Sequence, residues 1–236
     1  MNLIDTANIY GYGESEEIIA EALHPYPQDL LITTKAGFKP GKIVPGERSL
    51  PALGKPEHIR EECEKSLRRL RVDSIDLYQV HVPDPAVPYE DTVGAFAELQ
   101  LQGKVRHIGV SNVTAEQLAI AQSICEVATV ENRYNVGDRD SEAMVSLCEQ
   151  QGIAFFPWQP IAPEDQGARR ALAVMAEAHG VSVQQVALAW LLAHSVKVVP
   201  IPGTTNIDHL DDNVDAAWLS LDDADIATLD AVAEPS

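Results

Sequence analysis

The chain contains only three cysteines, Cys63, Cys125 and Cys148, and none of them belongs to a Cys-x-x-Cys pair. They are odd in number, far apart in sequence, and placed in segments of helical period. This pattern argues against a disulfide framework and a cysteine-based metal site. We expect three buried thiols in a reducing compartment.

The chain also lacks a long apolar run. No stretch approaches the roughly 18–20 consecutive apolar residues that span a bilayer. The first residues do not form a basic segment followed by an apolar one, which is the pattern of a secretory leader. These absences predict a cytoplasmic protein with no membrane partner.

Basic residues are scarce compared with acidic ones. Seventeen lysines and arginines face 36 aspartates and glutamates, giving a formal net charge of −19. A charge of this sign and size repels phosphates, so it argues against nucleic acid and anionic membranes as partners.

Short apolar runs alternate with longer stretches of helical period, which is typical of repeated βα units. No low-complexity tract divides the chain, so we expect one domain over residues 1–236. Seven runs are candidate strands: residues 3–4, 30–34, 76–80, 107–110, 128–130, 153–156 and 196–201. Most are continuously apolar, as expected for parallel strands that are covered on both faces.

Helix signals fall between these runs. Pro56 suits the first turn of a helix that carries Ile59, Cys63, Leu67 and Leu70 at helical spacing. Capping boxes are predicted where a serine or threonine precedes a glutamine or acidic residue by three positions: Thr114 with Gln117, Ser182 with Gln185, and Ser220 with Asp223.

Polar residues follow most of the apolar runs, which helps to choose between an open sheet and a barrel. Active sites of (β/α)-barrels are built at the carboxyl ends of all the strands. An open dinucleotide-binding sheet gathers its site at one crevice, and the first βα turn here has no G-x-G-x-x-G pattern. The sequence therefore predicts an α/β fold of the TIM (β/α)8 barrel type, with seven of its eight strands readable.

Four polar residues at or near the ends of the first three runs form a coherent acid–base set: Asp5, Tyr10, Lys35 and His81. Each has a structural explanation when taken alone, such as a cap, a boundary aromatic, a strand-end lysine or a core histidine. Together they supply what a carbonyl reductase needs. A tyrosine with a reference pKa near 10 is a poor acid at neutral pH, and a nearby ammonium stabilises its phenolate. A carboxylate holds the ammonium, and an imidazole binds the substrate oxygen.

At this point the sequence resembles the aldo-keto reductase family, over nearly its whole length and with its motifs in order. The stretch Asp5-Thr-Ala-Asn-Ile-Tyr10 is similar to the family segment that carries the catalytic tyrosine. Thr34-Lys35 resembles the lysine strand, and Asp76-Leu-Tyr-Gln-Val-His81 resembles the histidine strand. Gly109-Val-Ser111-Asn112, Phe156-Pro-Trp158-Gln-Pro160 and Ile201-Pro-Gly203-Thr204-Thr205 are similar to its cofactor segments.

The resemblance implies transfer of a hydride from NADPH, with NADH as an alternative donor, to an aldehyde or ketone. Tyr10 would be the general acid, Lys35 would tune it, Asp5 would anchor Lys35, and His81 would orient the substrate oxygen; no metal is required. The implied cofactor-binding residues are Ser111, Asn112, Glu131, Trp158, Gln159, Pro160, Ile161, Ile201, Gly203, Thr204, Thr205, His209, Asp212 and Asn213.

The sequence departs from the family at several positions. Family members usually have a strand and helix before the Asp-Thr-Ala strand, so the resemblance implies an N-terminally truncated barrel. Glu131 stands where the family commonly has a glutamine, and Gly203 and His209 stand where many members have a lysine and an arginine for the 2′-phosphate of NADP. NADPH is therefore expected to be preferred only moderately.

Two other functions remain open: a catalytically silent nucleotide-binding or redox-sensing barrel, and an inactive truncated remnant. The complete acid–base set argues against the first, because a binding module does not need one. The natural substrate and the oligomeric state are not predicted.

Overall fold

Strands and helices alternate along the chain in the computed structural model, which describes residues 2–41, 50–161 and 163–232. Six strands form one sheet in the order β1-β2-β3-β4-β5-β6. Their bounds are β1 Leu3–Asp5, β2 Leu31–Ala36, β3 Ile75–Val80, β4 Val105–Ser111, β5 Val127–Arg133 and β6 Ala154–Trp158.

Helices follow the strands. Their bounds are η1 Tyr10–Gly13, α1 Glu14–Leu23, α2 Pro56–Leu70, α3 Tyr89–Leu101, α4 Ala115–Ile124, α5 Glu142–Gln151, α6 Gln166–His179, α7 Val183–His194, α8 Ile207–Asp215, η2 Ala216–Trp218 and α9 Asp223–Asp230. In the part of the chain that the structure describes, no helix is both long enough and apolar enough to cross a bilayer.

The contacts divide the chain into two compact units, Met1–Val130 and Glu131–Ser236. The prediction of one domain over residues 1–236 stays a prediction.

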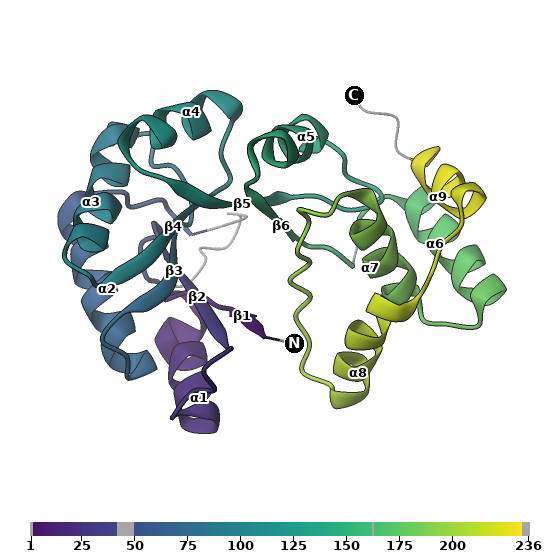
Figure 1. The fold of residues 1–236 in the computed structure, drawn as a ribbon, viewed down its shortest axis with the longest axis horizontal. Coiled ribbons are helices and arrows are strands. Elements are labelled where there is room, and N and C mark those ends of the chain that lie inside the picture. Colours follow the sequence, from purple (N-terminus) through teal and green to yellow (C-terminus); the bar gives the residue numbers. More distant parts are fainter. Residues whose placement is uncertain (1, 42–49, 162, 233–236) are drawn as a thin grey trace. The chain divides into compact units, whose positions relative to one another are not determined.

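In the first unit, the strand pairs β1–β2, β2–β3 and β3–β4 are all parallel. Helices α2 and α3 pack along the outer side of these strands (Figure 1). Helix α2 begins at Pro56, as predicted, and buries the apolar stripe Ile59, Cys63, Leu67 and Leu70. The periodic spacing of these residues therefore places the helix against the sheet.

In the second unit, α7 contacts both α6 and α8. Helix α7 carries Trp190, which is fully buried and stacks on Tyr134 with ring centroids 5.6 Å apart. Helix α8 differs from the other long helices because none of its residues is buried.

The prediction of a seventh strand at residues 196–201 is wrong. Residues 196–201 contribute only one isolated parallel bridge, Val198 to Phe155, closed by two backbone hydrogen bonds of 2.8 Å. Pro200 and Pro202 lack the N–H donors that a continuing ladder needs.

Two of the three predicted capping boxes are confirmed, at Thr114 and Ser182. The third is wrong, because Asp222 caps α9 with Asp225 as its partner. The expectation of three buried thiols is also wrong in part, since Cys125 is only half-buried.

Candidate active site

The four predicted acid–base residues all lie in the first unit, at the carboxyl ends of neighbouring parallel strands. Asp5 is the last residue of β1, Lys35 is the fifth residue of β2, and His81 directly follows β3. Tyr10 opens η1 after β1. Because parallel strands end at the same edge of a sheet, residues separated by up to 76 positions come together there.

Lys35 and Asp5 form a buried ion pair. Lys35 Nζ lies 2.5 Å from Asp5 Oδ2, and the Lys35 side chain is fully buried. The ammonium also donates to the Thr6 carbonyl at 3.2 Å, while the Thr33 hydroxyl donates to Asp5 Oδ1 at 2.5 Å. Both charges are therefore compensated by several partners, which a buried ion pair requires.

Tyr10 lies beside this pair and reaches the surface. Lys35 Nζ is 5.6 Å from the centroid of the Tyr10 ring, and Tyr10 is 42% exposed. The Tyr10 and His81 rings meet edge to face with centroids 6.1 Å apart. The structure thus brings together all four residues of the predicted set.

His81 is held in an apolar setting. It is 8% exposed, and the Phe38 ring packs against its ring at 4.7 Å between centroids. Burial and the nearby Lys35 ammonium lower the pKa of His81 from 6.5 to about 3. Its Nδ1 is buried and has no hydrogen-bond partner in the described part of the chain. A neutral imidazole keeps one N–H donor, which suits it to bind a carbonyl oxygen.

Ser111 and Asn112, predicted to bind the cofactor, lie in the same unit, where Ser111 ends β4 and Asn112 follows it. Asn112 has a left-handed backbone with φ of 57° and donates from Nδ2 to the His81 carbonyl at 2.9 Å. This bond links the end of β4 to the segment that carries His81.

The remaining predicted cofactor residues lie in the second unit, in two groups. Glu131 is buried within β5. Trp158 ends β6 and is half-buried, Gln159 has a left-handed φ of 56°, and Pro160 and Ile161 follow.

The second group surrounds the start of α8. Gly203, Thr204, Thr205 and His209 are exposed, whereas Ile201, Asp212 and Asn213 are half-buried. Asn206 caps α8 by accepting the Asp208 N–H at 2.8 Å, and the Thr204 hydroxyl accepts the Asn206 N–H at 3.1 Å. Both polar atoms of the Asn213 side chain are buried without a partner among the described residues.

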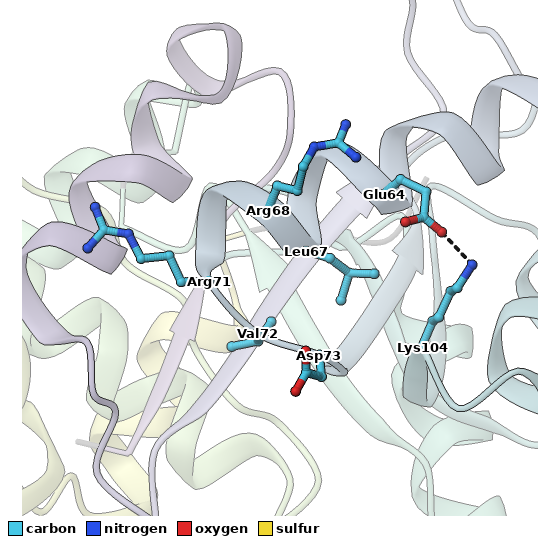
Figure 2. Close-up of a pocket in the computed structure, with 7 residues that line it drawn as sticks. All are labelled: Glu64, Leu67, Arg68, Arg71, Val72, Asp73 and Lys104. Carbon is cyan, nitrogen blue, oxygen red and sulfur yellow. Dashed lines mark hydrogen bonds and ion pairs between the residues drawn. The ribbon is translucent and has the colours of Figure 1, made fainter.

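A surface pocket of about 440 Å³ lies in the first unit, at the carboxyl end of α2 (Figure 2). Cations and carboxylates both line it, and Glu64 forms an ion pair with Lys104 across it. Its positive charges are largely balanced, and it shares no residue with the predicted site.

Two residues of this site were not predicted. Thr33 orients Asp5, and Phe38 encloses His81. Thr33 lies two positions before Lys35, so the period of a strand places both on one face, which was a readable signal. Phe38 lies beyond β2, and the sequence carries no signal for its contact.

Comparisons with known proteins agree with this geometry. The family model described as "Aldo/keto reductase family" matches residues 1–234. An uncharacterized oxidoreductase of Schizosaccharomyces pombe is 39% identical over 98% of this chain and 74% of its own length. Pyridoxine 4-dehydrogenase of Escherichia coli is 37% identical over 98% of this chain and 82% of its own.

Among solved structures, an aldo-keto reductase from Klebsiella pneumoniae in complex with NADPH superposes with a TM-score of 0.84 at 27% identity. The match covers all of this chain and 81% of that one. The predicted fold class, an α/β fold of the TIM-barrel type, is confirmed by this likeness. The chain belongs to the aldo/keto reductase family, a family of oxidoreductases.

Proposed function

We propose that this protein reduces aldehydes or ketones with a hydride from NADPH, and that Tyr10 is the general acid. The observation that carries the proposal is the buried Lys35–Asp5 ion pair next to the exposed Tyr10 ring. Burying a charge is costly even when it is paired, and such pairs cluster at functional sites, so this pair favours an acid–base role over a silent binding barrel.

The roles of the side chains follow from their protonation states. His81 has a pKa of about 3 and is therefore neutral at physiological pH, so it can donate a hydrogen bond but cannot act as the acid. Tyr10 is then the proton donor to the carbonyl oxygen. The Lys35 ammonium stabilises the phenolate that remains, and Asp5 holds the ammonium in place.

A buried side-chain amide without partners among the described residues suits a polar cofactor. It belongs to Asn213 in the second unit, whose Oδ1 and Nδ2 are both unpartnered there. We propose that Ser111, Asn112, Glu131 and residues 158–161 bind the nicotinamide part, with Trp158 stacking on its ring. Residues 201–205, His209, Asp212 and Asn213 would bind the adenosine part, where backbone N–H groups at a helix start attract phosphate. When bound, the reduced nicotinamide supplies the hydride.

The test is NADPH-dependent reduction of a panel of carbonyl compounds by the wild-type chain and by Tyr10→Phe. The panel includes pyridoxal, because a relative that is 37% identical is a pyridoxine 4-dehydrogenase. Loss of the general acid should lower kcat by about 100-fold or more, while NADPH affinity stays unchanged.

Tyr12→Phe is the matched control, since Tyr12 lies in the same short helix and is exposed. It should keep the wild-type rate within about twofold, as surface substitutions usually do. Equal rates for the Tyr10→Phe variant and the wild type would refute the assignment of the general acid.

A further inference from the structure

Three successive residues, the last of β5 and the two that follow it, contact the corner at Trp158 and Gln159. The Arg133 guanidinium carbon lies 5.7 Å from the centroid of the Trp158 ring. The Tyr134 N–H donates to the Trp158 carbonyl at 3.4 Å, and Asn135 Nδ2 donates to the Gln159 carbonyl at 3.1 Å. The Trp158 ring and the carbonyls of Trp158 and Gln159 are thus all contacted by residues 133–135.

This corner needs support because Gln159 has a φ of 56°, a left-handed conformation that glutamine rarely adopts. Such a conformation persists only where surrounding contacts impose it. The bond from Asn135 is one of these contacts, and it lies next to the ring that Arg133 covers.

Arg133 is itself fixed by two carboxylates from different segments. Its Nε lies 3.1 Å from Asp138 Oδ2, and its Nη2 lies 3.3 Å from Glu164 Oε1. The Nε–H does not point at the Asp138 oxygen, so this contact is an attraction between charges rather than a directed hydrogen bond. Asp138 is placed by a tight turn, in which Asn135 and Asp138 exchange two backbone bonds of 3.0 Å.

Glu164 belongs to the segment that follows β6, and that segment packs directly on the same turn. A Cβ atom on Gly137 would lie 2.9 Å from Ala168 Cβ and 3.0 Å from Pro163 Cβ, so only glycine allows this approach. The turn and the segment after β6 are therefore built to meet, and Arg133 joins them by charge.

We infer that Arg133 is a positioning residue for the cofactor. Its guanidinium lies against the Trp158 ring and fixes the plane in which that ring meets the nicotinamide. This inference rests on the proposed stacking of the nicotinamide on Trp158. Glu164 is largely exposed, so its bond to Arg133 opens most readily and salt weakens it.

The first experiment uses the protein without cofactor. Acrylamide quenching of tryptophan fluorescence is measured with and without the Trp158→Phe substitution. The difference between the two gives the quenching of Trp158 alone, apart from Trp190 and Trp218. Arg133→Met keeps the length of the side chain but removes the charge, and it should raise the quenching constant about twofold or more. An unchanged constant would overturn the inference, whether or not the chain binds NADPH.

The second experiment measures NADPH affinity and dissociation rate for the same variants. A contact between a cation and an aromatic ring at a partly exposed site corresponds to about a two- to fivefold change in Kd. Arg133→Met should weaken NADPH binding by that factor through faster dissociation. Arg133→Lys keeps the charge and should recover part of the loss, and Glu164→Gln should show a smaller loss that disappears at high salt.

The control is Arg106→Met, which removes an exposed arginine paired with Asp76 at 2.8 Å in the first unit. It should leave NADPH binding unchanged. Tighter binding by Arg133→Met would overturn the inference, because it would mean that the guanidinium occupies the face that the nicotinamide needs. If the wild-type chain fails to bind NADPH, the proposed function itself fails, and the role of Arg133 toward the cofactor fails with it.

Discussion

Burial determines the chemistry of this site at the scale of single residues. Lys35 has no exposed side-chain surface. Its ammonium is surrounded by the Asp5 carboxylate, the Thr6 carbonyl and the face of the Tyr10 ring. The same ammonium, added to the burial of His81, makes a charged imidazole unfavourable. One buried charge therefore bears on two proposed roles, because it favours the phenolate of Tyr10 and keeps His81 neutral.

The low pKa of His81 predicts a specific pH dependence of stability. The unfolded chain binds a proton on this histidine below pH 6.5, whereas the folded chain does so only near pH 3. His81 therefore makes the fold less stable as the pH falls through this window, and it has no such effect above it.

The substitution His81→Gln should remove this pH-dependent contribution to stability. Between pH 7 and pH 5, the wild-type free energy of unfolding should fall by about 2 kcal/mol more than that of the variant. Urea titrations of both proteins at the two pH values measure this difference. The other titrating groups are the same in both proteins, so their contributions cancel. Parallel pH curves for the two proteins would show that His81 titrates normally in the fold.

At the scale of strands and helices, register places the polar groups. Lys35 pairs in register with Gln79, and Gln79 pairs with Gly109 on the next strand. Gln79 accepts a hydrogen bond from the Thr129 hydroxyl at 2.8 Å, across the strand that carries Gly109. The glycine is required because a Cβ there would lie 2.1 Å from Thr129 Oγ1 and 2.8 Å from Gln79 Oε1.

The substitution Gly109→Ala should therefore destabilise the fold by about 1–3 kcal/mol, as overpacking of a filled interior does. Gly94→Ala is the matched control, because Gly94 lies within α3 and a Cβ there meets nothing within 4 Å. The control should be neutral or more stable by up to about 1 kcal/mol. Urea unfolding of both variants measures the contrast, and a Gly109→Ala protein as stable as the wild type would contradict this account of the interior.

Most of the strands and helices could be predicted from the sequence. Buried parallel strands are continuously apolar, and the apolar residues of the helices between them recur every three to four positions. The strand ends were less predictable. Asp5, Lys35 and Ser111 lie within the strands, not after them, since a polar residue can continue a ladder through its backbone alone. The run at 196–201 has the composition of a strand, but Pro200 and Pro202 interrupt its series of N–H donors and it forms one isolated bridge.

The same limit applies to the caps and the site. Near α9, both Ser220 with Asp223 and Asp222 with Asp225 match a capping box, and only backbone geometry selects the second. For the site, the positions of Asp5, Lys35 and His81 could be predicted from strand order. The contacts of Phe38 and Arg133 depend on the path of loops, which local sequence does not determine.

At the scale of the whole molecule, the net charge of −19 opposes the binding of an anionic cofactor. The proposed adenosine segment, residues 201–213, contains neither lysine nor arginine, and Asp208, Asp211 and Asp212 lie in it. Attraction there must come from backbone N–H groups and from neutral side chains such as Thr204 and Asn213.

This charge reduces the preference for NADPH over NADH that the family resemblance implies, so the preference should be modest and should grow with ionic strength. Salt screens the repulsion between the acidic chain and the additional 2′-phosphate over about 10 Å at 0.1 M. The ratio of the two Kd values, measured by tryptophan quenching at low and high salt, should stay within about tenfold and shift toward NADPH as salt rises. Tighter binding of NADH by tenfold at every salt concentration would exclude the preference.

The central claim is that Tyr10 supplies the proton while NADPH supplies the hydride to a carbonyl carbon. The most direct measurement uses NADPH in which both hydrogens at C4 of the nicotinamide are deuterium, with an aldehyde that the wild-type chain reduces. The product should carry the deuterium on its carbinol carbon, and Tyr10→Phe should form that labelled product about 100-fold more slowly or worse. A product without deuterium, or one formed equally fast by Tyr10→Phe, would contradict the claim.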